Sequence, residues 1–170
     1  MTTAVILAGG KSSRMGQDKA IMFGGVARIR TECMAANITK IITLCGVKER
    51  RFDFPGEVWP DPEDCNNLVE ILHWAFAKID GGILLIPCDA FSLTASGIAE
   101  INNMADCVPV DERGIRQPLH AKIVNRELLD WQGKSINELF ASYPSFRSER
   151  FGSEFTNYNT PKDLKNPRLQ

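Results

Sequence analysis

The sequence predicts a single-domain, doubly wound α/β fold with a mainly parallel, Rossmann-like sheet and a late antiparallel element. Three observations support this prediction. Residues 4–8 and 83–86 are apolar at every position, which is typical of central parallel strands covered on both faces. Strand-like and helix-like segments alternate over the first two thirds of the chain. A length of 170 residues suits one domain, so we expect residues 1–170 to form it.

The expected elements follow one another in a regular order. Strands are predicted over residues 4–8, 40–45, 57–60, 83–86, 106–110, 118–124 and 150–155. Helices are predicted over residues 26–37, 67–80, 94–104, 126–131 and from 135 onward. Two of these helices open with a capping-box pattern, at Asn67–Glu70 and at Ser135–Glu138. A terminal turn is expected at Thr160-Pro161.

Composition and charge narrow the classes of function. Hydrophobic residues make up 44% and charged residues 24% of the chain, as in an ordinary soluble protein. The net charge of −1 gives no overall field for a nucleic acid or a membrane, so neither is an expected partner. The five cysteines form no C-x-x-C pair, which argues against a disulfide framework and a zinc site. Without a signal-peptide pattern or a membrane-length apolar segment, we expect a cytoplasmic location.

A glycine-rich, cationic loop follows the first predicted strand. It opens with Gly9 and Gly10, which lack side chains and let a ligand lie directly on backbone N–H groups. The loop carries three cations and one acid, at Lys11, Arg14, Lys19 and Asp18. A buried strand that leads into such a loop is typical of phosphate binding. The alternative is an ordinary strand-to-helix turn with solvated cations.

Two familiar phosphate-binding motifs do not fit this loop. Gly10-Lys11-Ser12 resembles the end of a P-loop, but Val5 stands where that motif requires a glycine. The dinucleotide pattern G-x-G-x-x-G also fails, because Lys11 and Arg14 occupy its second and third glycine positions. The phosphate site is therefore of another kind.

Asp89 leaves the end of the buried strand over residues 83–86. Because ligands bind beyond the carboxyl ends of parallel strands, we expect Asp89 to face the Gly9 loop. Magnesium prefers one or two carboxylates with phosphate oxygens and water, which makes Asp89 the candidate metal ligand. We expect Lys19 to face solvent and Asp89 to be unpaired when no ligand is bound. A turn or helix-capping aspartate is the alternative.

Residues 7–20, LAGGKSSRMGQDKA, resemble the L-A-G-G-x-S-x-R-M-G-x-D-K signature of the molybdenum-cofactor guanylyltransferases. Three later segments resemble this family as well: residues 87–89 (PCD), 116–121 (RQPLHA) and 157–164 (NYNTPKDL). The resemblance implies a nucleotide-diphospho-sugar-transferase-like fold and one nucleotidyltransferase domain over residues 1–170. In the closing segment, Asn159 either orders the active-site wall or holds a turn.

The resemblance also implies an activity. GMP would pass from GTP to molybdopterin with release of pyrophosphate, Mg²⁺ would be the cofactor, and other molybdenum-cofactor assembly proteins would be partners. The residues implied to bind the nucleotide are Leu7, Ala8, Gly9, Gly10, Lys19, Asp61 and Asp89. Those implied in catalysis are Arg14, Lys19 and Asp89, with Asp89 also holding the metal. For Asp61, a solvated acidic turn with Glu63 and Asp64 is the alternative.

Two departures from the family pattern concern positions that would recognise the base and the acceptor. The usual G-P-L-A-G segment is replaced by residues 66–70, NNLVE, and Gly46 stands where an asparagine often contacts the base. These departures leave three functions open besides the guanylyltransferase. They are a cytidylyltransferase, a transferase acting on a sugar or alditol phosphate, and a non-catalytic nucleotide-binding relative.

Overall fold

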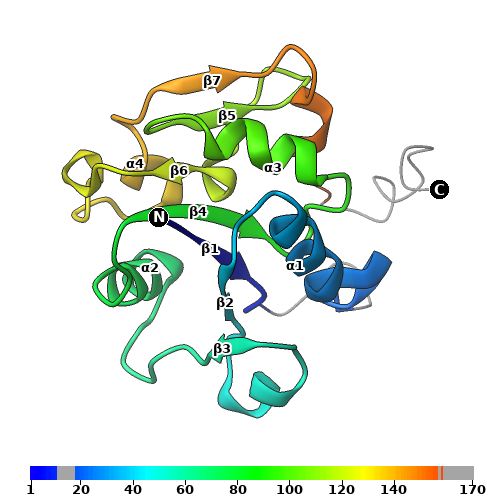
Figure 1. Cartoon of the computed structure of the whole chain (residues 1–170). Helices are drawn as coiled ribbons and strands as arrows, with labels where there is room; N and C mark the ends of the chain where they lie inside the picture. The colour runs from blue at the N-terminus through cyan, green and yellow to red at the C-terminus, as the bar shows by residue number, and fades with distance from the viewer. Residues whose placement is uncertain (11–17, 157, 159–170) are drawn as a thin grey trace.

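A five-stranded sheet forms the centre of the computed structural model, which describes residues 1–10, 18–156 and 158 (Figure 1). The strand order is β3-β2-β1-β4-β6. The strands are β1 (Thr2–Leu7), β2 (Lys40–Leu44), β3 (Glu57–Trp59), β4 (Gly82–Pro87) and β6 (Lys122–Ile123). The first four run parallel, and β6 pairs antiparallel with β4. The predicted mainly parallel sheet with a late antiparallel element is therefore confirmed.

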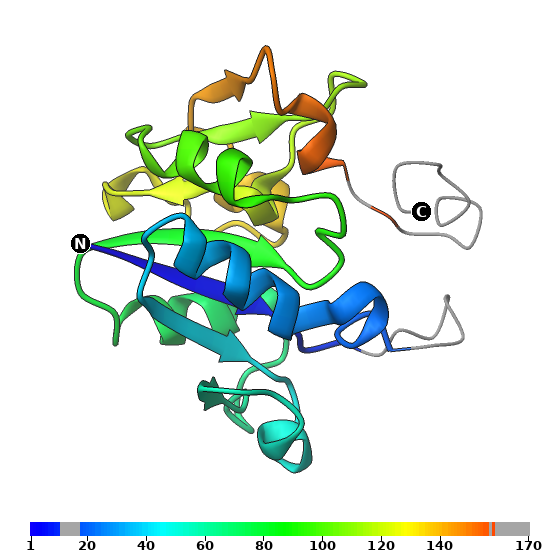
Figure 2. The same ribbon diagram turned by 45° about the vertical axis from the view of Figure 1, so that its right-hand side comes forward.

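Helices cover both faces of this sheet, as Figures 1 and 2 show. They are α1 (Gly25–Ala35), α2 (Leu68–Phe76), α3 (Ala95–Asn102) and α4 (Ile136–Leu139). Side chains of a strand alternate between its two faces, and β1 shows the result. Ala4 and Ile6 join the core beneath α1 and α3, whereas Val5 and Leu7 join the core beneath α2 and α4. Burial on both faces is the physical reason for the uninterrupted apolar run.

Local capping forms as the sequence predicts. The side-chain oxygen of Asn67 accepts from the backbone N–H of Glu70 at 3.1 Å and begins α2. The hydroxyl of Ser135 accepts from the N–H of Glu138 at 3.3 Å and begins α4. Among the helices that the structure describes, none is both long and apolar enough to cross a membrane.

The strand predicted over residues 118–124 is mostly wrong. Residues 118–120 form a 3₁₀ turn that begins at Pro118, and only Lys122–Ile123 pairs with β4. The N–H of Ala121 donates to the carbonyl of Pro118 at 3.1 Å and so closes the turn. Because proline has no N–H to contribute to a ladder, it favours the turn over a longer strand.

The late strand predicted over residues 150–155 is also wrong. The hydroxyl of Ser148 accepts from the N–H groups of Arg150 and Phe151 and turns the chain, and Gly152–Phe155 is a 3₁₀ helix. A strand lies just before this turn instead: β7 (Ser145–Arg147) pairs in parallel with β5 (Val108–Val110) in a second, two-stranded sheet. The terminal turn expected at residues 160–161 lies outside the described residues.

The order of the strands identifies the edge where a ligand would bind. β1 is flanked by β2 on one side and β4 on the other, because the chain adds β2 and β3 in one direction and then returns past β1 to form β4. Such a switch point opens a crevice beyond the carboxyl ends of the strands. The residues that follow these ends are Gly9, Gly46, Asp61 and Asp89. The strand ends therefore bring together most of the predicted site.

Candidate functional site

Lys19 and Asp89 meet at the carboxyl edge of the sheet. The ammonium nitrogen of Lys19 lies 2.8 Å from Oδ2 of Asp89, and it also donates to the carbonyl of Tyr158 at 2.8 Å. The predicted approach of the Gly9 loop and Asp89 is confirmed. The expectations that Lys19 faces solvent and that Asp89 is unpaired are wrong: their side chains are only 15% and 11% exposed. A mostly buried ammonium group needs hydrogen-bond acceptors or a negative charge nearby, and the Asp89 carboxylate provides both.

Asp89 is not a helix cap. The next helix, α3, is capped by Thr94, whose hydroxyl accepts from the N–H of Gly97. The capping alternative for Asp89 is therefore overturned. Beside it, burial and then the charge of Asp89 raise the pKa of the Cys88 thiol to about 12, so this thiol stays protonated near neutral pH. A protonated thiol is a poor nucleophile and a poor metal ligand.

Tyr158 is a site residue that sequence reasoning missed. Its ring is buried, lies 5.7 Å from the ring of Phe91, and its hydroxyl lies 2.6 Å from the hydroxyl of Ser92. Its carbonyl accepts the Lys19 ammonium. The signal for it was its place inside the closing motif, next to Asn159. Asn159 itself lies outside the described residues, as do Lys11 and Arg14.

A cavity of about 810 Å³ opens beside this edge of the sheet. Its walls include residues that follow β1, β2 and β3, namely Gly10, Gly46, Arg50 and Asp61. A smaller cavity of about 190 Å³ shares Gly10 and Asp61 and also reaches Gly9 and Leu7. Together the two cavities offer a small organic ligand both apolar walls and backbone groups.

Asp61 presents a carboxylate to both cavities. Its N–H donates to the carbonyl of Gly46 at 2.7 Å, which ties β3 to the end of β2. Burial raises the pKa of its carboxyl group, and its Oδ1 is buried with no hydrogen-bond partner among the described residues. A half-buried acceptor in a cavity wall differs from a solvated acidic turn, and it is suited to a ligand that brings donors.

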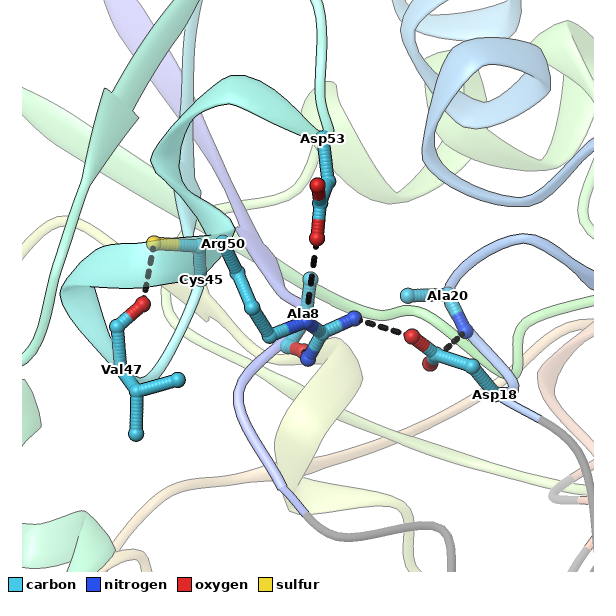
Figure 3. A network of polar contacts seen from close by, with 7 residues as sticks. All are labelled: Ala8, Asp18, Ala20, Cys45, Val47, Arg50 and Asp53. Atoms are coloured by element: carbon cyan, nitrogen blue, oxygen red, sulfur yellow. Dashed lines mark hydrogen bonds and ion pairs between the residues drawn. The ribbon is translucent and has the colours of Figure 1, made fainter.

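The backbone after β1 is already engaged at two of the predicted positions. The Leu7 carbonyl accepts from the N–H of Cys88 at 3.0 Å, and the Ala8 N–H donates to the Leu44 carbonyl at 2.8 Å. The Ala8 carbonyl accepts from the guanidinium of Arg50 at 2.7 Å (Figure 3). Because a carbonyl oxygen has two lone pairs, a base that donates to Ala8 would share it with Arg50. Sequence reasoning missed Arg50, which lies in a polar connection without a recognisable motif.

Gly9 and Gly46 cross at a distance that only glycine permits. A Cβ at Gly9 would lie 2.9 Å from the nitrogen of Gly46, and a Cβ at Gly46 would lie 3.0 Å from Cα of Gly9. Gly46 also has a φ of +79°, in the left-handed region. Gly9 lines the smaller cavity and Gly46 the larger one, so this close approach lies in the wall between strand ends that both cavities use.

Comparison with known proteins identifies the family. Residues 4–143 match the MobA-like NTP transferase domain. The chain belongs to this family. Two curated relatives bear the name "probable molybdenum cofactor guanylyltransferase". That of Synechococcus elongatus is 33% identical over 120 residues, or 65% of this chain and 61% of the relative. That of a Nostoc species is 31% identical over 126 residues, or 71% of this chain and 60% of the relative.

This MobA-like chain thus spans about 60% of the length of the curated relatives it matches. Two solved structures share its fold. A nucleotidyl transferase from Methanothermobacter thermautotroptrophicus has a TM-score of 0.71 at 17% identity, covering 96% of this chain and 94% of that one. A 4-diphosphocytidyl-2C-methyl-D-erythritol synthase from Anaerococcus prevotii has a TM-score of 0.54 at 10% identity, with the same coverages. The family resemblance and the nucleotide-diphospho-sugar-transferase-like fold are confirmed.

Residues 66–70, which replace the usual G-P-L-A-G segment of the family, form the capped N-terminus of α2. The Glu70 carboxylate accepts from the N–H of Asn66 at 2.7 Å and from the Asn67 side chain at 2.7 Å. All three side chains are exposed. These polar side chains do not line the smaller cavity, whose wall on this side is formed by Leu68 and Ile71.

The contact between Gly9 and Gly46 predicts a stability effect. Gly46→Ala should destabilise the protein by at least about 1 kcal/mol more than Gly114→Ala, because its Cβ meets backbone that cannot easily move. Gly114 is the matched control: its φ is +82°, but a Cβ there would meet only the Arg147 side chain, at 3.5 Å. Urea unfolding of both variants measures the difference. Equal losses would show that the crossing tolerates a side chain.

Proposed function

We propose that this chain is a magnesium-dependent nucleotidyltransferase that transfers GMP from GTP to molybdopterin, already carrying molybdenum, and releases pyrophosphate. The proposal depends mainly on one observation. Lys19 and Asp89, from segments far apart in sequence, lie 2.8 Å apart at the strand ends beside the glycine pair. A cation and a carboxylate placed together at a switch point suit the charges of a triphosphate and its metal.

The reaction needs positioning and charge stabilisation more than covalent catalysis. An oxygen of the terminal phosphate of molybdopterin forms a bond to the α-phosphorus of GTP, while the bond from that phosphorus to the bridging α–β oxygen breaks. The bonding electrons leave with pyrophosphate. Lys19 and Arg14 would neutralise the charge that develops on the phosphate oxygens. As the nucleotide enters, the Lys19 ammonium would exchange part of its contact with Asp89 for these oxygens.

The Asp89 carboxylate fits a magnesium ion. Its Oδ2 already faces a positive group, the Lys19 ammonium, at the carboxyl end of β4. Within the described part of the chain, no group of three or more His, Cys, Asp or Glu side chains could hold a metal. Because magnesium needs only one or two protein carboxylates, Asp89 would bind Mg²⁺ together with phosphate oxygens and water. When bound, Mg²⁺ would stabilise charge and orient the phosphates.

Guanine would be recognised in the cavities beside Gly9 and Gly10. The Asp61 carboxylate can accept from the N1–H and amino donors of guanine, and the backbone of Leu7, Ala8, Gly9 and Gly10 would supply the remaining contacts. Gly46 contributes no side chain, so one contact that relatives often make is missing. This departure keeps the cytidylyltransferase, the sugar- or alditol-phosphate transferase and the non-catalytic relative as alternatives.

Residues 1–170 would form one nucleotidyltransferase domain that acts in the cytoplasm. Its partners would be GTP, molybdopterin and other molybdenum-cofactor assembly proteins. A net charge of −1 supports the expectation that neither a nucleic acid nor a membrane surface is a partner.

A titration with all four nucleoside triphosphates and magnesium tests the proposal. GTP should bind best, because a wrong base would leave buried polar groups of the site without partners. Its margin over ATP and CTP should be smaller than in a protein with an additional side-chain contact to the base, since Gly46 supplies none. Isothermal calorimetry measures the four affinities, and pyrophosphate release on addition of molybdopterin then separates an enzyme from a binder. Exclusive binding of CTP would favour a cytidylyltransferase. Binding of none of the four would overturn both activities.

A further inference from the structure

Arg50 connects two chain segments that flank the glycine-rich stretch. It lies on the 3₁₀ helix Lys48–Phe52, and one guanidinium nitrogen donates to the Ala8 carbonyl at 2.7 Å. The other terminal nitrogen lies 2.5 Å from Oδ2 of Asp18. Figure 3 shows this ion pair. The side chain is only 18% exposed, and its guanidinium carbon lies 5.0 Å from the ring centre of Phe54. Arg50 is therefore held in one orientation.

Two of the groups that Arg50 contacts, Ala8 and Asp18, flank residues 9–17, while its Nε lies 3.8 Å from Oδ2 of Asp53. Ala8 follows β1 directly, and Asp18 precedes Lys19. Asp18 is itself fixed, because its Oδ1 accepts from the N–H of Ala20 at 3.0 Å. One guanidinium thus joins the end of a central strand to the residue that precedes Lys19 in the chain. A planar guanidinium suits two acceptors at once, whereas a lysine ammonium is a point charge without this geometry.

We propose that Arg50 is a positioning residue for triphosphate binding, acting through Ala8 and Asp18. This inference rests on the proposed function. By joining Ala8 to Asp18, Arg50 sets the position of Lys19 relative to the backbone of Gly9 and Gly10, so that one triphosphate meets both. A protein that already has its binding groups in place loses less conformational entropy when the ligand binds.

The rival explanation is that Arg50, which lines the larger cavity, contacts the phosphates directly. The substitution Asp18→Asn separates the two explanations by the sign of its effect. The introduced amide oxygen could still accept from the N–H of Ala20, but the amide NH₂ group would face Arg50, and a negative charge is removed. If Arg50 positions Lys19 relative to Gly9 and Gly10, this variant should bind triphosphate more weakly. If Arg50 is a direct contact, a freed guanidinium and one carboxylate fewer should strengthen binding.

The test measures the affinity for GTP with magnesium by calorimetry and then kcat and KM by pyrophosphate release. Arg50→Ala and Arg50→Lys should each weaken binding about tenfold to hundredfold, as expected for loss of charge-assisted hydrogen bonds. Asp18→Asn should weaken it about tenfold. The effect should fall on KM more than on kcat, and adding Asp18→Asn to Arg50→Ala should cost little more. Arg51→Ala is the matched control, since Arg51 is the exposed neighbour on the same turn.

Circular dichroism and thermal unfolding establish that each variant is folded. If Arg50→Ala does not fold, Arg50→Lys and Asp18→Asn carry the test. Unchanged affinity in Arg50→Lys, or tighter binding in Asp18→Asn, would overturn the positioning role while leaving the proposed function intact. Failure of the unsubstituted protein to bind any triphosphate would overturn the proposed function and this inference with it.

Discussion

Asp89→Asn should lower turnover by about a hundredfold to a thousandfold, the range seen when a preorganised electrostatic contact is removed. A neutral amide is a far weaker magnesium ligand than a carboxylate. The same substitution should also destabilise the ligand-free protein by about 1–2 kcal/mol, because it replaces one partner of a charge-assisted hydrogen bond. We expect a loss of stability because Asp89 forms a 2.8 Å ion pair with Lys19. If the carboxylate were unpaired, replacing it with an amide would leave the free energy of unfolding unchanged or raise it.

Asp80→Asn is the matched control for this substitution. Asp80 is an exposed aspartate just before β4, whereas Asp89 follows the same strand at its other end. The measurements are initial rates over a range of magnesium concentrations and thermal unfolding without metal. Activity equal to that of Asp80→Asn at every magnesium concentration would remove Asp89 from the site.

Lys19→Ala should lower turnover by a similar factor, about a hundredfold to a thousandfold, because the ammonium would stabilise the charge that develops during transfer. Unlike the substitution of a solvent-facing lysine, it should also lower the free energy of unfolding. The Asp89 carboxylate and the Tyr158 carbonyl both lose a donor at 2.8 Å. Leaving a mostly buried charge without this partner costs about 1–3 kcal/mol.

Lys134→Ala serves as the control, because Lys134 is exposed just before α4 and far in sequence from the candidate site. The double variant Lys19→Ala with Asp89→Asn should be less destabilised than the sum of the single variants, by about 0.5–3 kcal/mol. Strict additivity in urea unfolding would mean that the ion pair contributes nothing in solution. Wild-type turnover in Lys19→Ala would contradict its place in the reaction.

The central strands and the capped helices were predictable because they depend on short-range sequence patterns. A strand buried on both faces must be apolar at every position, so the runs at β1 and β4 indicated the centre of the sheet. Asn67 and Ser135 predicted the starts of their helices because an N-cap side chain bonds to the backbone N–H only three residues further on. Asp89 could be placed opposite the glycine loop because the ends of parallel strands share one edge. Family motifs added residues that spacing alone would not have identified.

The remaining features depend on contacts between residues far apart in sequence. The sequence of residues 108–147 gives no sign that β5 and β7 pair in a separate sheet, because strand pairing is decided by which surfaces remain to be buried. Neither Arg50 nor Tyr158 belongs to a local pattern that shows its partners.

The sequence by itself thus determined the central strands, their caps and the residues at the strand ends, since burial and hydrogen bonding over a few residues are encoded locally. Only the tertiary structure decided how the charges at that edge are paired. Lys19 binds Asp89 and Arg50 joins Ala8 to Asp18 because folding brings these groups to the same place. Mostly buried charges there must find partners.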